Sequence, residues 1–453
     1  MSAGRVARRS LAVIGILIVL LIIVVAGTWI WAMDYPREAT IEPTPATLSI
    51  LAGPIPDGPQ AALLRRGRYL AVAGDCVSCH TRKGGAPFAG GLGLGTPFGL
   101  IYSPNITSDA DTGIGNWTPD QFYRALTHGV DDEGHHLYPA FPYPWFTRVS
   151  RADSDAILAW LKTVPAVHYT APGNRLPFPA DIRLSLAAWN GMFFRPGRFI
   201  ADPNRSPEWN RGAYFVNGLG HCGACHTPLN LVGAAERNRF LQGSNLNQWV
   251  APDLTGNART GLGRWSVDDI VEYLRTGRNA HANASGPMAE VVAYSTSLLT
   301  DSDLRAAAIY LKSLPASADT AAAAPDAAAM RRGAAIFSDA CASCHLADGS
   351  GQPRLFPPLP GSAVAQQKDP AGLIHLILAG GRTAPTPTRP APLAMPSFAW
   401  KLDDQETADV ATYVRNAWGN RAAPVPESAA AHMRKALRLA APLAIERNRA
   451  PNR

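Results

Sequence analysis

Three segments of the chain have the apolar spacing of amphipathic helices. In residues 301–312, apolar side chains recur at i, i+3, i+4 and i+7, which puts them on one face of a helix. Residues 153–162 and 403–415 have the same character. Each segment is therefore predicted to close one structural unit by packing its apolar face across another helix.

The N-terminal region carries one long apolar run without charges. As a helix, residues 11–33 would span about 34 Å, which is enough to cross a bilayer. Arg5, Arg8 and Arg9 precede the run, and this placement favours a cytoplasmic start and export of the remaining chain. The pattern predicts a signal anchor with a transmembrane helix in residues 1–35, with a cleaved signal peptide as the alternative.

The composition indicates several globular domains. The chain has 453 residues, more than one hydrophobic core organises, and 47% of them are apolar while 17% are charged. These proportions exclude a coiled coil and a disordered chain. The formal net charge of +7 is too diffuse to indicate nucleic acid, but it is compatible with contact to anionic lipid.

All six cysteines belong to three copies of one motif, C-x-x-C-H. Two thiols three positions apart can bond both vinyl groups of one porphyrin, and the adjacent histidine presents its imidazole to the iron. The sequence therefore predicts three covalent haem c groups with histidine as the proximal ligand. The attachment residues are Cys76, Cys79, Cys222, Cys225, Cys341 and Cys344, and the proximal ligands are His80, His226 and His345.

A thioredoxin-like redox pair and a zinc site also use closely spaced cysteines. Neither needs a histidine directly after the second cysteine, and a tetrahedral zinc ion would need further ligands nearby. Haem attachment is the interpretation that accounts for the whole motif.

The motif copies predict an all-α fold, in which one N-terminal transmembrane helix is followed by three cytochrome-c-like domains. A glycine on the helix before each motif, at Gly67, Gly212 and Gly333, is expected to permit close helix packing. The predicted domains are residues 60–196, 205–316 and 328–420, with a linker at 36–59 and a basic C-terminal tail at 421–453.

The first two copies agree beyond the motif, since residues 104–107 match residues 252–255. Trp117 and Trp265 also correspond, and each is a candidate for donating its indole N–H to a haem propionate or, alternatively, a packed core residue. Predicted N-caps open the next helix in both copies, and they are Thr118 with Gln121 and Ser266 with Asp269.

Two methionines occupy matching places in the second and third copies. Met288 and Met395 each lie beside a proline shortly before the closing helix. Thioether ligation gives a six-coordinate haem of high potential, so both are predicted as iron ligands of an electron carrier. The alternative for each is an ordinary apolar core residue.

The first copy differs at this place, because Phe141 stands there and phenylalanine cannot bind iron. Its haem is therefore either five-coordinate or ligated by another side chain. His136, His135 and His128 lie on the approach to this loop and are the candidates. A histidine ligand would set a lower potential than methionine and make this haem energetically distinct.

Four stretches around these residues resemble one family, the membrane-bound three-haem cytochrome c subunits of bacterial periplasmic alcohol, aldehyde and sugar dehydrogenases. The stretches are GDC at 74–76, GHHLYPA at 134–140, GHCGACHTP at 220–228 and GPMAEVV at 286–292, and the resemblance covers residues 62–419. It implies an electron-transfer subunit in the bacterial inner membrane, with the haem domains facing the periplasm, and not an enzyme in its own right.

By the same resemblance, electrons come from a catalytic subunit with a molybdenum, quinone or flavin cofactor and pass to ubiquinone or a terminal oxidase. A small iron–sulfur subunit and membrane lipid are further expected partners. Phe141 together with residues 189–197 and 208–212 looks closest to subunits that accompany molybdenum-hydroxylase aldehyde dehydrogenases. The residues alone also allow a peroxidase-like enzyme, with an open first haem and His135 or His136 as acid–base catalyst.

Overall fold

The computed structural model describes residues 44–55, 57–246, 248–319, 322–440 and 442, and of the preceding region only residues 15, 19, 20, 23 and 27. The chain divides into two compact units. The first comprises Met1–Ala71 and Asp75–Phe199, and the second comprises Val72–Gly74 and Ile200–Arg453. The first unit therefore holds the first C-x-x-C-H motif, and the second unit holds the other two.

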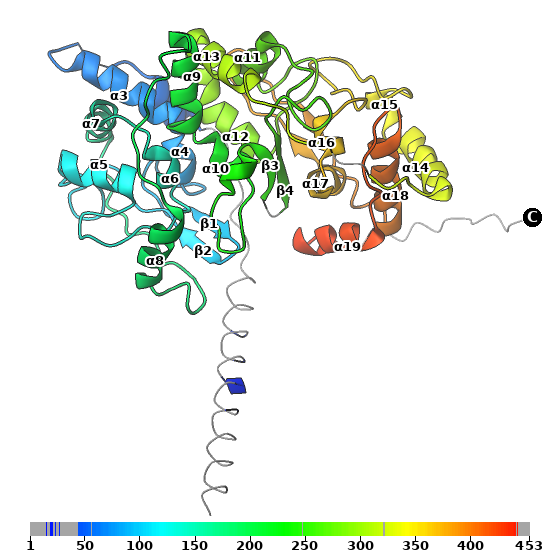
Figure 1. The fold of residues 1–453 in the computed structure, drawn as a ribbon, viewed down its shortest axis with the longest axis horizontal. Helices are drawn as coiled ribbons and strands as arrows, with labels where there is room; N and C mark the ends of the chain where they lie inside the picture. The colour runs from blue at the N-terminus through cyan, green and yellow to red at the C-terminus, as the bar shows by residue number, and fades with distance from the viewer. Residues whose placement is uncertain are drawn as a thin grey trace, which may run out of the picture. The chain divides into compact units, whose positions relative to one another are not determined.

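In its described residues, the first unit is built from short helices and one hairpin (Figure 1). In chain order these are α2 (Pro45–Ala52), α3 (Ala61–Ala73), α4 (Cys76–Cys79), β1 (Gly93–Thr96), β2 (Gly99–Tyr102), α5 (Pro119–His128), α6 (Tyr143–Phe146), α7 (Arg151–Leu161) and α8 (Leu184–Phe193).

The second unit repeats an opening helix, a motif turn and a closing helix. Its first half contains α9 (Pro207–Asn217), α10 (Cys222–His226), η1 (Arg237–Arg239), β3 (Gln242–Leu246), β4 (Trp249–Asp253), α11 (Val267–Thr276), α12 (Pro287–Tyr294), η2 (Thr296–Leu298) and α13 (Asp301–Lys312). Its second half contains α14 (Ala327–Ala340), α15 (Ala342–His345), α16 (Ala363–Gln366), α17 (Ala371–Ala379), β5 (Gly381–Arg382), β6 (Ala394–Met395), α18 (Asp404–Asn416) and α19 (Glu427–Ala436).

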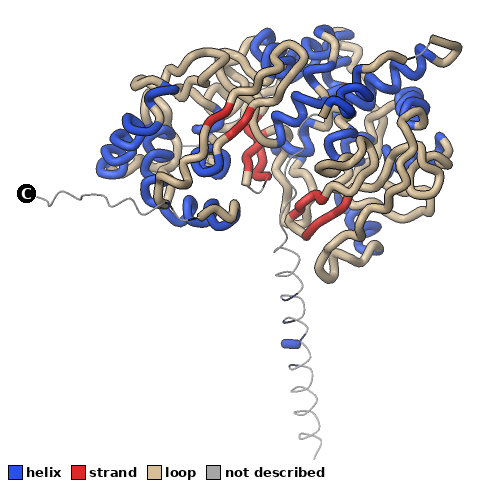
Figure 2. Tube along the Cα trace, turned by 180° about the vertical axis from the view of Figure 1, so that it is seen from behind, coloured by secondary structure: helices blue, strands red, loops and turns tan. Residues whose placement is uncertain are grey.

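The prediction of an all-α fold is wrong, because each motif is followed by a short antiparallel pair of strands (Figure 2). The strands are only two to five residues long, so they lack the long apolar alternation by which a strand is recognised in a sequence. At the β1–β2 turn, Gly99 has φ of +117°, a conformation that glycine adopts readily. The end pairs of the registers are Gly93↔Tyr102 and Thr96↔Gly99, Gln242↔Asp253 and Leu246↔Trp249, and Gly381↔Met395 and Arg382↔Ala394.

The predicted transmembrane helix is not supported. Residues 1–35 lie outside the described residues, apart from the isolated positions named above. Within the part of the chain that the structure describes, no helix is both long and apolar enough to span a bilayer. In the predicted linker, residues 36–59, the structure describes helix α2, whose first turn is capped by the Thr44 hydroxyl.

A glycine on each opening helix lets the closing helix of the same copy cross at backbone contact distance. A Cβ atom at any of the three would clash with a main-chain oxygen of the other helix, so a larger residue would displace it. The clashing pairs are Gly67 on α3 with Ala156 on α7, Gly212 on α9 with Ala306 on α13, and Gly333 on α14 with Asp409 on α18. The close packing predicted for these glycines is confirmed.

The arginine before each of these glycines forms an ion pair with an aspartate of the closing helix. The aspartate side chains are largely buried, and a buried carboxylate is costly without a partner. Each pair therefore joins the opening and closing helices at their crossing. The pairs are Arg66–Asp153, Arg211–Asp303 and Arg332–Asp409.

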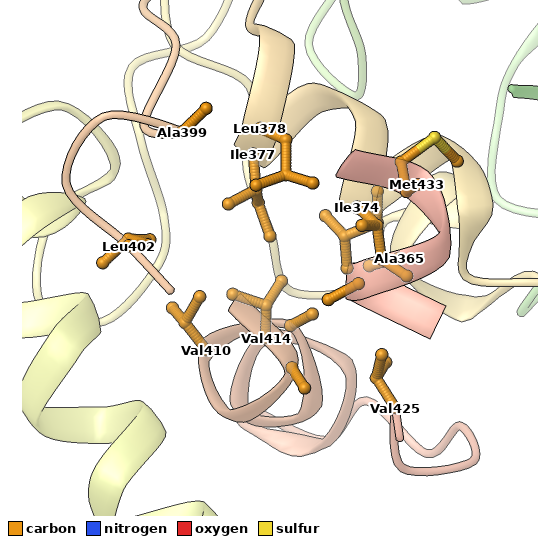
Figure 3. Close-up of a cluster of buried hydrophobic side chains, with 14 of the residues drawn as sticks. Ala365, Ile374, Ile377, Leu378, Ala399, Leu402, Val410, Val414, Val425 and Met433 are labelled. Atoms are coloured by element: carbon orange, nitrogen blue, oxygen red, sulfur yellow. The ribbon is translucent and has the colours of Figure 1, made fainter. Parts of the chain in front are cut away.

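The apolar core of the third copy lies between helices α14, α17, α18 and α19 (Figure 3). Ile374 and Leu378 come from α17, Val410 and Val414 from α18, and Met433 from α19. All five side chains are buried. Helix α19, which lies in the segment predicted as a basic tail, is thus packed into the third copy.

Candidate functional site

Each motif histidine is oriented by a proline carbonyl. Because the carbonyl oxygen only accepts, Nδ1 of the imidazole carries the proton and donates it, which leaves the lone pair of Nε2 available to a metal ion. Burial lowers the pKa of all three imidazoles and favours the neutral form that binds iron. The pairs are His80 with Pro104 at 2.8 Å, His226 with Pro252 at 2.7 Å and His345 with Pro357 at 3.1 Å.

The hairpins position two of these prolines. Pro252 lies within β4, and Pro104 follows shortly after the end of β2. Just beyond each proline, a backbone bond ties the chain to the segment that follows the motif: Ile106 N–H donates to Phe88 at 2.9 Å, and Leu254 N–H donates to Leu241 at 2.8 Å. The strands that the sequence did not predict therefore help to orient the motif histidines, and the repeated proline was the signal that could have shown it.

A residue in the left-handed conformation precedes the motif in the first two copies. Asp75 has φ of 50° and His221 has φ of 33°. The Asp75 carboxylate accepts a bond from the Ser78 hydroxyl at 2.5 Å, and aspartate tolerates this region better than most residues. This turn separates the opening helix from the single-turn helix that carries the cysteine pair.

The cysteine environment fits haem attachment better than the other cysteine chemistries. Burial raises the pKa of the Cys76 and Cys222 thiols to about 12 and that of Cys341 to about 11, whereas redox-active pairs lower it. In the described ranges, no group of three or more His, Cys, Asp or Glu side chains is placed to hold a metal ion. Two sulfurs three positions apart and a neutral imidazole are the donor set that haem c requires.

The two candidate methionine ligands are held in different ways. Met288 lies in the first turn of α12, which follows Gly286 at φ of +56°. Met395 lies on β6 and pairs with Gly381 on β5. Both side chains are half-buried. Their ligation of iron stays a prediction.

The three histidine candidates of the first copy have different surroundings. His135 is exposed, with Nδ1 3.3 Å from the Glu133 carboxylate. His128 lies at the exposed end of α5, with Nδ1 2.8 Å from the Thr127 hydroxyl. His136 is the one of the three that is half-buried. The structure brings it, and neither of the others, against α8.

Helix α8 supplies a polar contact that sequence reasoning did not identify as part of the site. The amide of Asn190 lies between two side chains: the Tyr143 hydroxyl donates to its Oδ1 at 2.5 Å, and its Nδ2 lies 3.2 Å from Nδ1 of His136. Tyr143 is fully buried, and burial raises its pKa far enough that the phenol stays protonated as a donor. An amide within the otherwise apolar run around Trp189 was the available signal.

The corresponding tryptophans Trp117 and Trp265 are both half-buried. The Trp265 ring lies between Tyr273 and His281, at 5.3 Å from each ring and nearly parallel to the imidazole. Among the described residues, neither indole N–H donates a hydrogen bond to a protein group. Both remain candidates for contact with a propionate.

The family model for cytochrome c matches residues 330–418. This range covers the third motif, with His345 and Met395, between helices α14 and α18. The third copy therefore has the sequence pattern of a cytochrome c domain over residues 330–418.

Three relatives are similar to most of the chain. The gluconate 2-dehydrogenase cytochrome c subunit of Pantoea cypripedii is 43% identical over 83% of this chain and 90% of its own length. The cytochrome c subunit of the quinone alcohol dehydrogenase of Gluconobacter oxydans is 43% identical over 80% of both chains. The fructose dehydrogenase cytochrome subunit of Gluconobacter japonicus is 37% identical over 88% of this chain and 86% of its own length.

All three relatives are named as cytochrome subunits and are covered over most of their length, so the resemblance seen in the motifs extends over most of the chain. The peroxidase-like alternative is not supported by these names. This chain belongs to the family of cytochrome c subunits of dehydrogenases, which carry haem c and transfer electrons rather than oxidise the substrate themselves.

Proposed function

We propose that this protein relays electrons through three covalent haem c groups, one at each C-x-x-C-H motif. The observation that carries the proposal is the recurrence of one geometry: all three motif histidines donate from Nδ1 to a proline carbonyl. A subunit with a single haem would need this arrangement once. When bound, haem c supplies a one-electron ferrous/ferric couple.

The chain's own residues hold the three groups and set them apart. In the second and third copies, the sulfurs of Met288 and Met395 would bind the iron together with the motif histidine, and thioether ligation would raise its potential. In the first copy, Phe141 offers no ligand, and His136 is the favoured replacement because it is half-buried and contacts Asn190. The first haem therefore has the lower potential and serves as an entry or exit point.

The electron donor is the catalytic subunit of a dehydrogenase, as the names of the relatives support. Among catalytic subunits of the molybdenum, quinone and flavin types, the sequence of residues 189–197 together with Phe141 favours the molybdenum type. Ubiquinone or a terminal oxidase accepts the electrons. The haem-bearing units work on the periplasmic side of the bacterial inner membrane, and the support is the resemblance of residues 62–419 to the cytochrome c subunits of periplasmic dehydrogenases.

The number of attached haems tests the proposal directly. Mass spectrometry and a pyridine haemochrome assay on the denatured full chain should give three haems. Replacing Cys222 and Cys225 together with alanine should leave two, because the second porphyrin loses both attachment sulfurs. The matched control is Ala224→Ser, which gives the second motif the serine that the first motif has at Ser78 and should keep all three.

A wild-type chain that carries one or two haems would contradict the relay of three. The partner is tested separately by purifying the full chain from its native membranes and identifying the large subunit that accompanies it. A molybdenum content equimolar with the complex supports the favoured type, and a bound quinone or flavin cofactor rejects it.

A further inference from the structure

Trp249 on β4 is held by a histidine of the third copy. The Trp249 and His375 rings lie 3.9 Å apart between centroids, with 31° between their planes. Nδ1 of His375 also donates to the carbonyl of Gln248 at 3.0 Å. His375 lies on α17 and is only 8% exposed. Two neighbouring residues of the second copy are thus fixed by one buried side chain of the third.

The Trp249 ring also lies against the turn before Met288. A Cβ atom at Gly286 would lie 2.5 Å from Cε2 of Trp249, so the ring presses directly on the backbone at this position. Gly286 has φ of +56° and is the N-cap of α12, the helix whose first turn contains Met288. A displacement of the indole would therefore reach the main chain two residues before the candidate ligand.

The same strand also holds the motif histidine of the second site. Trp249 begins β4, and the carbonyl of Pro252 on that strand accepts the bond from His226 at 2.7 Å. One short strand therefore contacts both the motif histidine and the turn that leads to Met288. Any movement of β4 changes the two candidate ligands together.

The methionine loops of the second and third copies also touch. A Cβ atom at Gly381 would lie 3.3 Å from Cβ of Ser285, and Gly381 is the strand partner of Met395. Ser285 directly precedes Gly286. The turn that leads to Met288 thus lies against Trp249, which His375 of the third copy contacts, and beside Gly381 of the third copy.

We propose that His375 is a positioning residue for the second haem site: through Trp249 it fixes the Gly286 turn, and so it controls how well Met288 binds iron. The proposal rests on the proposed function, in which Met288 is an iron ligand. Packing of the third copy then sets the potential of the second haem, although His375 itself contacts neither candidate ligand.

The test replaces His375 with alanine in the full-length protein carrying its haems. The far-red charge-transfer band of methionine-ligated ferric haem should weaken, because the turn before Met288 loses its support. Redox titration should show one haem with a lower potential, by about 59 mV for each tenfold loss in the preference of the sulfur for ferrous iron. His375→Phe, which keeps a ring over Trp249 but loses the hydrogen bond, should restore most of the band.

The matched control is Arg354→Ala. The Arg354 guanidinium pairs with Glu272 and also joins the second copy to the third, but it contacts neither Trp249 nor Gly286. This variant should keep the band and the potentials. An equal change in Arg354→Ala and His375→Ala would mean general loosening of the contact between the copies and would overturn the proposal.

Unchanged spectra and potentials in His375→Ala would also overturn it. If that variant fails to retain haem, Trp249→Phe tests the proposal in its place, because the smaller ring cannot contact both His375 and Gly286. A weakened band is then expected, and a normal band counts against the proposal. Met288→Ala distinguishes a failure of the proposed function from a failure of the positioning role of His375. If this variant leaves every band intact, the assignment of Met288 as a ligand fails, whatever the His375 variants show.

Discussion

The first and second copies orient their motif histidines alike but complete the surroundings with different parts of the chain. Since residues 104–107 match residues 252–255, Leu100 corresponds to Gln248. Leu100 exchanges two backbone bonds of 2.8 Å with Arg175, in the segment that leads to α8. The Gln248 carbonyl instead accepts a bond from the imidazole of His375, in the third copy.

The candidate ligand loops differ in the same manner. In the first copy, Asn190 of α8 reaches His136 and Tyr143, so a local addition to the chain supports the loop. In the second copy, Trp249 supports the turn at Gly286. In both copies, residues close to the motif thus orient the motif histidine in the same way. The candidate ligand loop, in contrast, is supported by whichever segment packs against it. Under the proposed function, the copies are therefore expected to differ in potential while each keeps its haem.

The largest effect is expected from exchanging the residues at the matching ligand places. Met288→Ala should turn one haem high-spin and lower its potential on the order of 100 mV, because the thioether that stabilises ferrous iron is lost. Phe141→Met should add a methionine band and raise the potential of the first haem. Electron paramagnetic resonance and redox titration of the full chain measure both changes. All three haems should stay attached, and loss of a haem from Met288→Ala would point to a structural role instead.

A smaller effect, equal in the two copies, is expected at the helix crossings. Gly67→Ala and Gly212→Ala each place a Cβ atom directly against a carbonyl oxygen of the closing helix. Each should cost about 1–3 kcal/mol and lower the melting temperature by about 2–4 °C per kcal/mol, as measured by circular dichroism. Gly191→Ala on α8 is the control, since its Cβ meets nothing within 4 Å. If only one crossing proves sensitive, the two copies are not packed by the same rule.

The smallest effect is a difference in acid sensitivity between the two capping boxes. These are Thr118 with Gln121 on α5 and Ser266 with Asp269 on α11. Burial alone would raise the pKa of Asp269, but hydrogen bonds from Ser266 and the nearby His281 outweigh it and lower that pKa. A lowered pKa means that the stabilisation is present above the unfolded value of about 3.9 and is lost as pH falls through the folded value.

Helix α11 should therefore lose up to about 1 kcal/mol of protection in acid, whereas the uncharged cap of α5 should not change. Hydrogen exchange of the two helices, followed from neutral pH to about pH 3, measures the difference. Asp269→Gln should abolish the pH dependence, and Gln121→Glu should transfer it to α5. Equal acid sensitivity of both helices in the wild type would argue against the assignment to the caps.

Local chemistry was predictable from the sequence. Both capping boxes are confirmed, as are the packing glycines before each motif, because each depends on residues a few positions apart or on a crossing that recurs three times. The closing helix predicted at residues 301–312 is α13. The strand pairs were not predicted, because strands of two to five residues carry too little pattern. The transmembrane prediction for residues 1–35 is not supported by the described residues.

The sequence by itself determined which residues are the candidates for haem attachment, because attachment needs two sulfurs and an imidazole within five consecutive positions. The tertiary structure alone decided which residues support the candidate second-ligand loops. Asn190 lies beside His136 in one unit, and His375 lies on Trp249 in the other. These partners lie far apart along the chain, and no spacing rule joins them. Their contacts form only when whole helices pack, so the fold, and not the motif, distinguishes one copy from the next.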